Sequence, residues 1–140
     1  MPVRYPVSFL EGIYDREQFY AMAEGLEDVP EGGERCRKCF SLRLNEAAEK
    51  AAEGGFDYFT TTLSISPLKN AQMLNEIGME AGRKYGVKYL NSDFKKKDGY
   101  RRSVELSKKY GLYRQDYCGC EFSYRERQQQ KRQAAEQETN

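Results

Sequence analysis

The chain has 140 residues and a mass of 16.3 kDa, which is the length of a single ordinary domain. With 39% hydrophobic and 32% charged residues the composition excludes a disordered chain, and no apolar run approaches the roughly 20 residues of a membrane-spanning helix. Histidine is absent, which excludes Ser-His and Cys-His catalysis and histidine-ligated zinc, so the four cysteines become the candidates for metal or redox chemistry. The first residues lack the pattern of a secretion signal, and we therefore expect a cytoplasmic protein without a membrane partner.

The N-terminal third predicts two helices after an extended segment. Residues 5–10 have the composition of a strand, but their proline indicates an edge strand or an entry segment. A capping pattern at Asp15 predicts a short amphipathic helix, and residues 28–33, with proline and a glycine pair, predict a loop. A second helix is expected from about Glu34 to the Gly54-Gly55 pair.

The middle of the chain predicts a strand, a helix and a second strand. Residues 56–63 are rich in aromatic and β-branched side chains, which is typical of a buried strand. Apolar residues then repeat at helical spacing over residues 70–85, and residues 87–90 form another strand-like run. Two strands joined through a helix predict a crossover unit with parallel strands.

The last third is increasingly polar. After a lysine-rich loop we expect a helix over residues 100–110, a short loop over residues 112–120 that holds two cysteines, and then a partly exposed helix that frays. The predicted division is an α/β redox or metal domain, residues 1–120, followed by a polar C-terminal helix or tail, residues 121–140.

The fold class predicted from these elements is α/β, with a small parallel sheet flanked by helices. Two or three short strands make a very small sheet, whereas crossover folds use more strands to cover both faces. The sequence therefore predicts that one or more N-terminal strands are lacking, either because they lie on another chain or because the natural N-terminus is absent from this sequence.

The first cysteine pair, Cys36 and Cys39, falls in the first predicted turn of the second helix. Residues three apart on a helix share a face, and a helix start favours thiolate over thiol, so both sulfurs can bind one ion or cluster. The C-x-x-C spacing indicates metal or redox chemistry, and the structural alternative is four ordinary buried thiols.

The second pair, Cys118 and Cys120, is separated by one glycine. Thiols this close can form a small, strained disulfide, and strain makes such a bond labile, which suits redox catalysis. The rival interpretation is that both cysteine pairs together form one tetrahedral zinc site with four thiolates.

Four sequence blocks identify a known family when they are taken in order. They comprise residues 25–44 with the C-x-x-C pair, residues 58–69, residues 94–107, and residues 111–124 with the C-x-C pair. In these blocks the chain resembles the epoxyqueuosine reductases of the QueH type, over about residues 14–127.

The resemblance implies the two-electron removal of the epoxide oxygen of epoxyqueuosine in tRNA, the last step of queuosine biosynthesis. It implies that Cys36 and Cys39 are ligands of a [4Fe-4S] cluster and that Cys118 and Cys120 are a redox-active pair. Members of the family bring two further ligands from an adjacent cysteine pair near the N-terminus, which this sequence does not contain, so that two of the four ligands are expected in this chain.

The implied partners are a tRNA, recognised at its anticodon wobble position, and an unidentified electron donor. Residues 91–140 carry 12 basic and 8 acidic residues, a net charge of +4, which suits a polyanion and is equally typical of a solvated surface. The candidate phosphate contacts are Lys95, Lys96, Lys97, Arg101, Arg102 and Arg114. The candidates for stacking on bases are Tyr100, Tyr113 and Tyr117. Lys69 and the hydroxyls of residues 60–64 follow a predicted strand, and we expect them to face the crevice in which α/β sheets bind their ligands.

Several questions stay open at the level of sequence. The departing oxygen needs a proton, and the candidate acids are a thiol, Tyr117, Asp98 and Asp116. Two alternative functions also stay open: a zinc-stabilised RNA-binding module without catalysis, and a thiol-disulfide protein that uses only its C-x-C pair.

Overall fold

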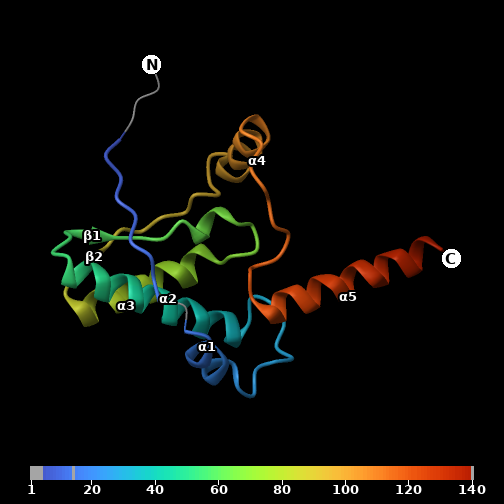
Figure 1. Ribbon diagram of the computed structural model, residues 1–140, viewed down its shortest axis with the longest axis horizontal. Helices are drawn as coiled ribbons and strands as arrows, with labels where there is room; N and C mark the ends of the chain where they lie inside the picture. The colour runs from blue at the N-terminus through green and yellow to red at the C-terminus, as the bar shows by residue number, and fades with distance from the viewer. Residues whose placement is uncertain (1–4, 14, 140) are drawn as a thin grey trace.

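The computed structural model describes residues 5–13 and 15–139, and its two longest packed helices lie side by side beside a small sheet (Figure 1). In chain order the elements are α1 (Arg16–Ala23), α2 (Glu34–Glu53), β1 (Tyr58–Phe59), the 3-10 turn η1 (Leu63–Ile65), α3 (Ala71–Tyr85), β2 (Lys88–Tyr89), α4 (Gly99–Lys109) and α5 (Glu121–Glu138). The predicted α/β class is confirmed, and the helices begin and end close to the predicted positions.

Local chemistry explains where the helices start and stop. The Asp15 carboxylate accepts a hydrogen bond from the Gln18 amide at 3.0 Å, and the Asn70 side chain accepts one from the Met73 amide at 3.1 Å, so each satisfies an amide that the helix leaves free. α3 ends at Gly86, whose φ of +73° is a left-handed conformation that glycine adopts without strain.

The sheet consists of two parallel strands, with Tyr58 opposite Lys88 and Phe59 opposite Tyr89, joined by the crossover through α3. The parallel pairing was predicted correctly. The length of the first strand was not, because the chain leaves the ladder after Phe59 and turns into η1 at Leu63.

The predicted strand or entry segment at residues 5–10 forms no strand in the structure. Its apolar side chains, among them Val7, Phe9 and Leu10, are exposed. Proline lacks the amide that a ladder needs, and the two described strands pair only with each other, so the segment has no neighbour with which to form a ladder.

The core lies between α2, α3 and the sheet. Leu44 from α2 and Leu74 from α3 are almost completely buried, and Phe59 and Val87 close the core from the side of the sheet. Gly82 allows this close packing, since a Cβ at this position would lie 2.5 Å from the Val87 carbonyl oxygen. α2 and α3 run in the same direction, and both strands run in the opposite direction (Figure 1). The N-terminal ends of these helices and the C-terminal ends of the strands therefore lie at the same end of the molecule.

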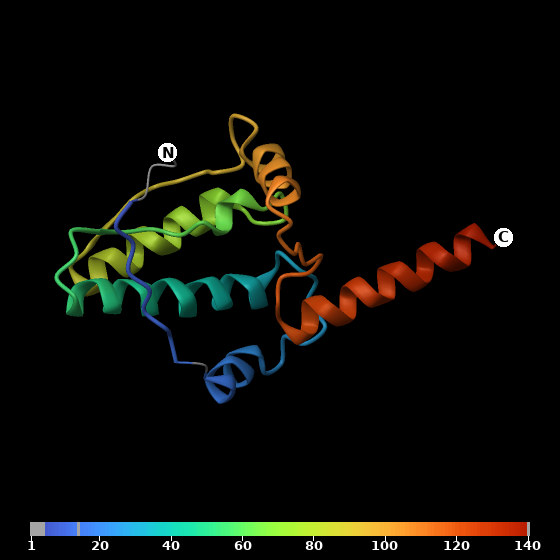
Figure 2. The same cartoon turned by 45° about the horizontal axis from the view of Figure 1, so that its top comes forward.

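The last helix, α5, buries side chains against the body in its first turn, and its next turns contact Glu31 and Asp116 through Glu126, Arg127 and Lys131. Phe122 and Ser123 are buried, and the Phe122 ring lies 6.0 Å from the Phe19 ring of α1. The remainder of α5 projects away from the body (Figures 1 and 2). Across residues 5–13 and 15–139, the structure contains no helix with both the length and the apolar character needed to cross a membrane.

Candidate redox site

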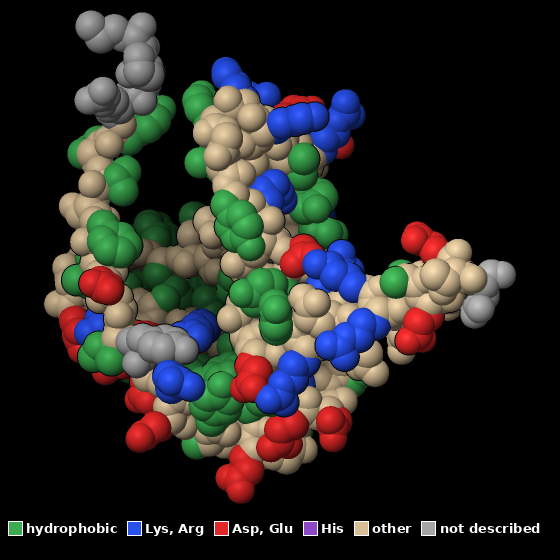
Figure 3. Space-filling model, turned by 45° about the vertical axis from the view of Figure 1, so that its right-hand side comes forward, with side chains coloured by type: hydrophobic (Ala, Val, Ile, Leu, Met, Phe, Trp, Pro, Cys, Tyr) green, Lys and Arg blue, Asp and Glu red, His purple; other side chains and the backbone are tan. Residues whose placement is uncertain are grey.

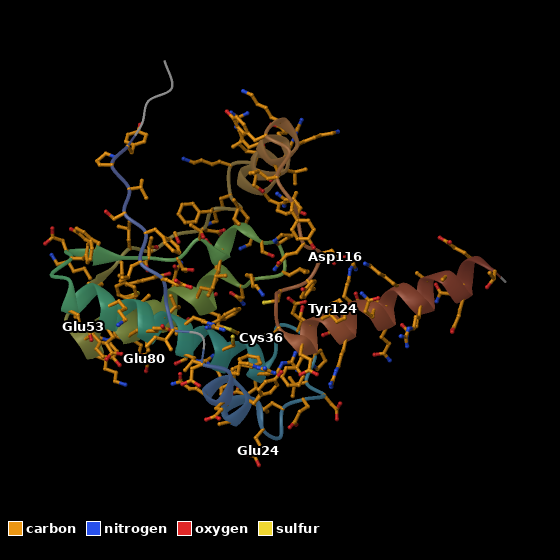
Figure 4. All side chains as sticks on the ribbon, viewed as in Figure 1. Glu24, Cys36, Glu53, Glu80, Asp116 and Tyr124 are labelled. Atoms are coloured by element: carbon orange, nitrogen blue, oxygen red, sulfur yellow. The ribbon has the colours of Figure 1, made fainter. Side chains whose placement is uncertain are left out.

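The four cysteines gather near the shared end of the molecule, where α2 and α5 begin. Cys36, labelled in Figure 4, lies in the first turn of α2 and is only 8% exposed. Its Sγ accepts a hydrogen bond from the Gly32 amide at 3.4 Å, so the loop that leads into α2 holds this sulfur in place. The prediction that the C-x-x-C pair falls in the first turn of this helix is confirmed for Cys36, whereas Cys39 lies in the second turn.

Cys39 lies one turn further along α2 and is half-buried. Burial raises the pKa of the Cys39 thiol above its ordinary value; the charge of Arg43 opposes the shift, and the sulfurs of Cys118 and Cys120 add to it. The electrostatic influence of the second pair on the first means that the fold brings both pairs to one region, although they are about 80 residues apart in sequence.

The second pair is held by the start of α5. The Cys120 Sγ caps this helix and accepts a hydrogen bond from the Ser123 amide at 3.4 Å, while the Cys118 amide donates to the Ser123 Oγ at 2.8 Å. Gly119 between them has φ of +112°, a conformation that disfavours other residues. All four cysteines are free thiols, and Cys118 is the exposed one.

A buried lysine contacts the exposed thiol. The Lys69 Nζ lies 2.8 Å from the Cys118 Sγ and 3.4 Å from a carboxylate oxygen of Glu31, and Lys69 is only 6% exposed. Burial alone would lower the pKa of Lys69, but the hydrogen bond and charge of Cys118, together with Glu31, outweigh burial and raise this pKa. Lys69 therefore remains an ammonium ion beside the sulfur.

The Cys118 side chain opens on a pocket of about 800 Å³. This volume is within the range of roughly 300–1,000 Å³ that is typical of small-molecule sites. The pocket is lined by Glu31, Ile65, Ser66, Pro67, Leu68, Lys69, Tyr100, Arg114, Gln115, Asp116, Tyr117, Cys118, Ser123, Glu126, Arg127 and Gln130. It therefore combines a thiol, cationic side chains and two tyrosines.

Several of the predicted binding residues meet in this pocket, and others do not. Lys69, Arg114, Tyr100 and Tyr117 line it together with Cys118. The predicted residues outside the lining are Lys95, Lys96, Lys97, Arg101, Arg102 and Tyr113, and all of these except Lys95 are exposed. Figure 3 shows Lys and Arg side chains over α4 and along the projecting part of α5.

The lysine of the predicted run that is closest to the core is engaged by the protein itself. The Lys95 Nζ donates to the carbonyl oxygens of Ser64 at 3.1 Å and of Lys69 at 3.0 Å, and it lies 3.3 Å from a carboxylate oxygen of Asp93. The predicted strand-end hydroxyls are engaged in a similar way, since the Ser64 Oγ accepts a hydrogen bond from the Phe94 amide. These contacts tie the loop before α4 to η1 and to the loop that carries Lys69.

Comparison with known proteins identifies the family. The family model described as epoxyqueuosine reductase QueH matches residues 3–126, which is most of the chain. The chain belongs to the QueH family. Relatives named epoxyqueuosine reductase QueH are 52% identical in Streptococcus pyogenes serotype M1, 49% in Staphylococcus epidermidis and 41% in Thermotoga maritima. Each alignment covers 84% of this chain and 46%, 50% and 63% of the respective relative, so the chain spans about half the length of the curated relatives it matches.

The cysteines of this QueH family member fit only in part the iron-sulfur cluster that the family resemblance implies. The thiols of Cys36 and Cys39 are of the kind that iron-sulfur clusters bind, and they lie on one helix face, but they are two where a cluster needs four. In the part of the chain that the structure describes, no three or more Cys, Asp or Glu side chains lie close enough to hold a metal ion. The described residues therefore supply two thiols of the kind a cluster binds, and the predicted alternative of one four-thiolate zinc site is not found among them.

The candidate proton donors of this QueH family member differ in how well their position and pKa suit proton transfer in the pocket. Hydrogen bonding from Lys131 lowers the pKa of Asp116, with a smaller contribution from Arg127, so this carboxyl group keeps no proton near neutral pH and is a poor proton donor. Asp98 is the residue before α4 and lies outside the pocket lining. Besides Asp116, the predicted acids that line the pocket are Tyr117 and the thiol of Cys118.

Sequence reasoning missed two residues that shape the site. Glu31 was treated only as part of a loop, although its carboxylate binds Lys69. Ser123 was not singled out, although its position three residues after Cys120 is the spacing of a helix cap and could have indicated the contact.

Proposed function

We propose that the chain forms the cysteine-bearing part of an epoxyqueuosine reductase, which removes the epoxide oxygen of epoxyqueuosine in tRNA and produces queuosine. The observation that carries this proposal is the pocket of about 800 Å³, in which Cys118 lies beside Lys69 and Arg114 and two tyrosines, in a lining of mixed charge. Thiols supply electrons, arginines bind phosphate, and tyrosines stack on unpaired bases, so the lining suits a reactive base in an anticodon loop.

The chemistry balances with the residues of the C-x-C pair. Two thiols and one epoxide yield one disulfide, one alkene and one water molecule, so Cys118 and Cys120 supply both electrons and both hydrogens. The two C–O bonds of the epoxide break, and one S–S bond forms. An electron donor that remains to be identified then returns the disulfide to two thiols.

Cys36 and Cys39 are proposed as two of the four ligands of a [4Fe-4S] cluster. A bound cluster supplies electrons one at a time. The position of both residues in the first turns of α2 supports their role, because the free amides and partial positive charge of a helix start favour thiolates. A tRNA substrate also supports the predicted cytoplasmic location.

The remainder of the tRNA is proposed to lie over the basic side chains that surround the pocket. Arg114 and Arg127 line the pocket itself. Lys96, Lys97 and Arg101 are exposed and lie within four residues in the sequence of Tyr100, which is also part of the lining. Replacing Lys96 and Lys97 together with alanine should weaken tRNA binding and reduce its salt dependence, since each phosphate contact contributes to the salt slope. An unchanged affinity and slope would remove these lysines from the interface.

The test of the proposed reaction is a single turnover without oxygen. The fully reduced chain, in excess, is mixed with tRNA that contains epoxyqueuosine, and the tRNA is digested and analysed for queuosine by mass spectrometry. We expect queuosine to form with the loss of two thiols, and we expect Cys118→Ser and Cys120→Ser to abolish the product. A chain that reduces small disulfides but leaves epoxyqueuosine unchanged while binding the tRNA would instead be a thiol-disulfide protein.

A further inference from the structure

The two thiols of the C-x-C pair have different surroundings. Cys118 is exposed, lines the pocket and receives the Lys69 ammonium group at 2.8 Å. Cys120 is half-buried, lies outside the pocket lining, and its sulfur receives the Ser123 amide of α5 at 3.4 Å. One sulfur thus faces a full positive charge and the other a backbone dipole.

Lys69 is fixed from several sides. Its ammonium group binds Glu31 at 3.4 Å and lies 5.5 Å from the centre of the Phe40 ring. Its carbonyl oxygen accepts a hydrogen bond from Lys95, and the Glu31 amide donates to a carboxylate oxygen of Glu126 on α5. Three segments that are distant in sequence therefore place this one cation against the sulfur.

A cation in this position has a direct effect on cysteine chemistry. The thiolate is the nucleophilic form of cysteine, and a positive charge in hydrogen-bonding contact stabilises it. The other charged or titratable groups around Cys118 come from several parts of the fold. They are Cys39 on α2, Glu31 before α2, Tyr100 on α4, Arg114, Asp116 and Tyr117 on its own loop, and Glu126 and Arg127 on α5. Of these and Lys69, it is the Lys69 ammonium that the structure shows bound to the Cys118 sulfur.

We propose that Lys69, held by Glu31, is the cation that makes Cys118 the first sulfur of the pair to react and leaves Cys120 to resolve the product. This assignment deepens the proposed function, on which it rests for its substrate. It does not rest on the two cysteines of α2.

The reaction sequence that follows is balanced. The Cys118 thiolate attacks an epoxide carbon, so that a C–S bond forms, one C–O bond breaks, and the released alkoxide takes a proton from Lys69. The Cys120 sulfur then attacks the Cys118 sulfur. The S–S bond forms, the C–S electron pair becomes the alkene, and the hydroxyl leaves as water with the proton of Cys120.

Alkylation of the reduced full chain tests this assignment without any tRNA, so its failure is distinguishable from failure of the proposed reaction. The chain is treated with iodoacetamide from pH 5 to pH 10, and peptide mass spectrometry gives a rate for each cysteine. We expect the rate at Cys118 to rise at lower pH than the rate at Cys120. The position of the pH midpoint reports on the thiolate, whereas the greater exposure of Cys118 affects only the size of its rate.

Variants of Lys69 separate charge from packing. Lys69→Met should move the Cys118 midpoint up, measured as about tenfold slower alkylation of Cys118 at a fixed pH below the midpoint, and should leave the alkylation of Cys120 unchanged. Lys69→Arg should retain a low midpoint. Lys50→Met, on an exposed lysine of α2, is the matched control and should change neither midpoint.

Two results would overturn the assignment. In the unmodified chain, a Cys120 midpoint equal to or lower than that of Cys118 is sufficient, and this measurement does not depend on whether any variant folds. A Lys69→Met chain that keeps its circular dichroism spectrum and an unshifted Cys118 midpoint is the second.

Discussion

The buried Arg35 offers the sharpest test of how the site is held together. This residue is 2% exposed, and its Nη1 donates to the carbonyl oxygens of Leu26 at 3.0 Å, Glu27 at 3.3 Å and Val29. Its guanidinium carbon lies 4.8 Å from the centre of the Phe122 ring. One side chain thus connects the loop before α2, the helix that carries the C-x-x-C pair, and the first turn of α5.

The cost of replacing Arg35 with methionine follows from these contacts. Nη1 has two N–H groups, so the three carbonyls correspond to two full hydrogen bonds, and a bond from a charged donor contributes about 1.5–3 kcal/mol. The contact with the ring adds about 1 kcal/mol. Since methionine retains much of the apolar packing, these terms together are the expected loss, and we expect Arg35→Met to lower the free energy of unfolding by about 4–7 kcal/mol, a large share of the roughly 5–15 kcal/mol of a typical domain.

Urea unfolding followed by far-ultraviolet circular dichroism measures this loss. The midpoint should fall while the slope m remains unchanged, as expected when stability but not the native compactness changes. Arg37→Met, on an exposed arginine two residues further along α2, is the control and should stay within about 0.5 kcal/mol of the unmodified chain. A loss of less than about 1 kcal/mol for Arg35→Met would refute the role assigned to these hydrogen bonds.

Two further predictions concern the loop that carries the second cysteine pair. Ser123→Ala removes the acceptor of the Cys118 amide and should speed hydrogen exchange at that amide roughly fivefold, equivalent to about 1 kcal/mol, whereas Ser123→Thr should retain the protection. The pKa of Asp116 is below its ordinary value of 3.8 because Lys131 donates a hydrogen bond to it, so the stability that this contact contributes is present above pH 3.8 and is lost as the pH falls through the folded pKa. Hydrogen exchange of residues 112–120, corrected for its intrinsic pH dependence, should therefore accelerate at low pH, and Asp116→Asn should show no such step.

The helices and the parallel crossover could be predicted because their signals are local. Asp15 and Asn70 cap their helices through side chains that are adjacent in sequence, and Gly86 ends α3 through its own backbone conformation. The strands were predicted less well. Aromatic and β-branched composition indicates where a strand is possible, but pairing with a neighbour decides its length, and β1 keeps only Tyr58 and Phe59.

The candidate site was predictable in its parts and not in its contacts. The two cysteine motifs could be identified from their spacing, and the family from the resemblance of four sequence blocks. The contact between Lys69 and Cys118 joins residues 49 positions apart, and Lys95, predicted as a phosphate contact, is bonded to backbone carbonyls. Only the folded chain brings such groups together, because neither charge nor composition shows which cation is engaged by the protein.

The attachment of α5 also couples the orientation of this helix to Cys120, the residue that caps its start. The helix begins directly after Cys120, is secured by the buried Phe122 and Ser123 and by contacts of Glu126, Arg127 and Lys131 with the body, and extends to Glu138. At 1.5 Å per residue its length is roughly 27 Å, so a tilt of about 10° at the cysteine displaces the far end by roughly 5 Å. A fluorescent label near Gln137 is thus placed to register, as a change in distance to the body, whether the thiols beside the pocket are reduced or joined.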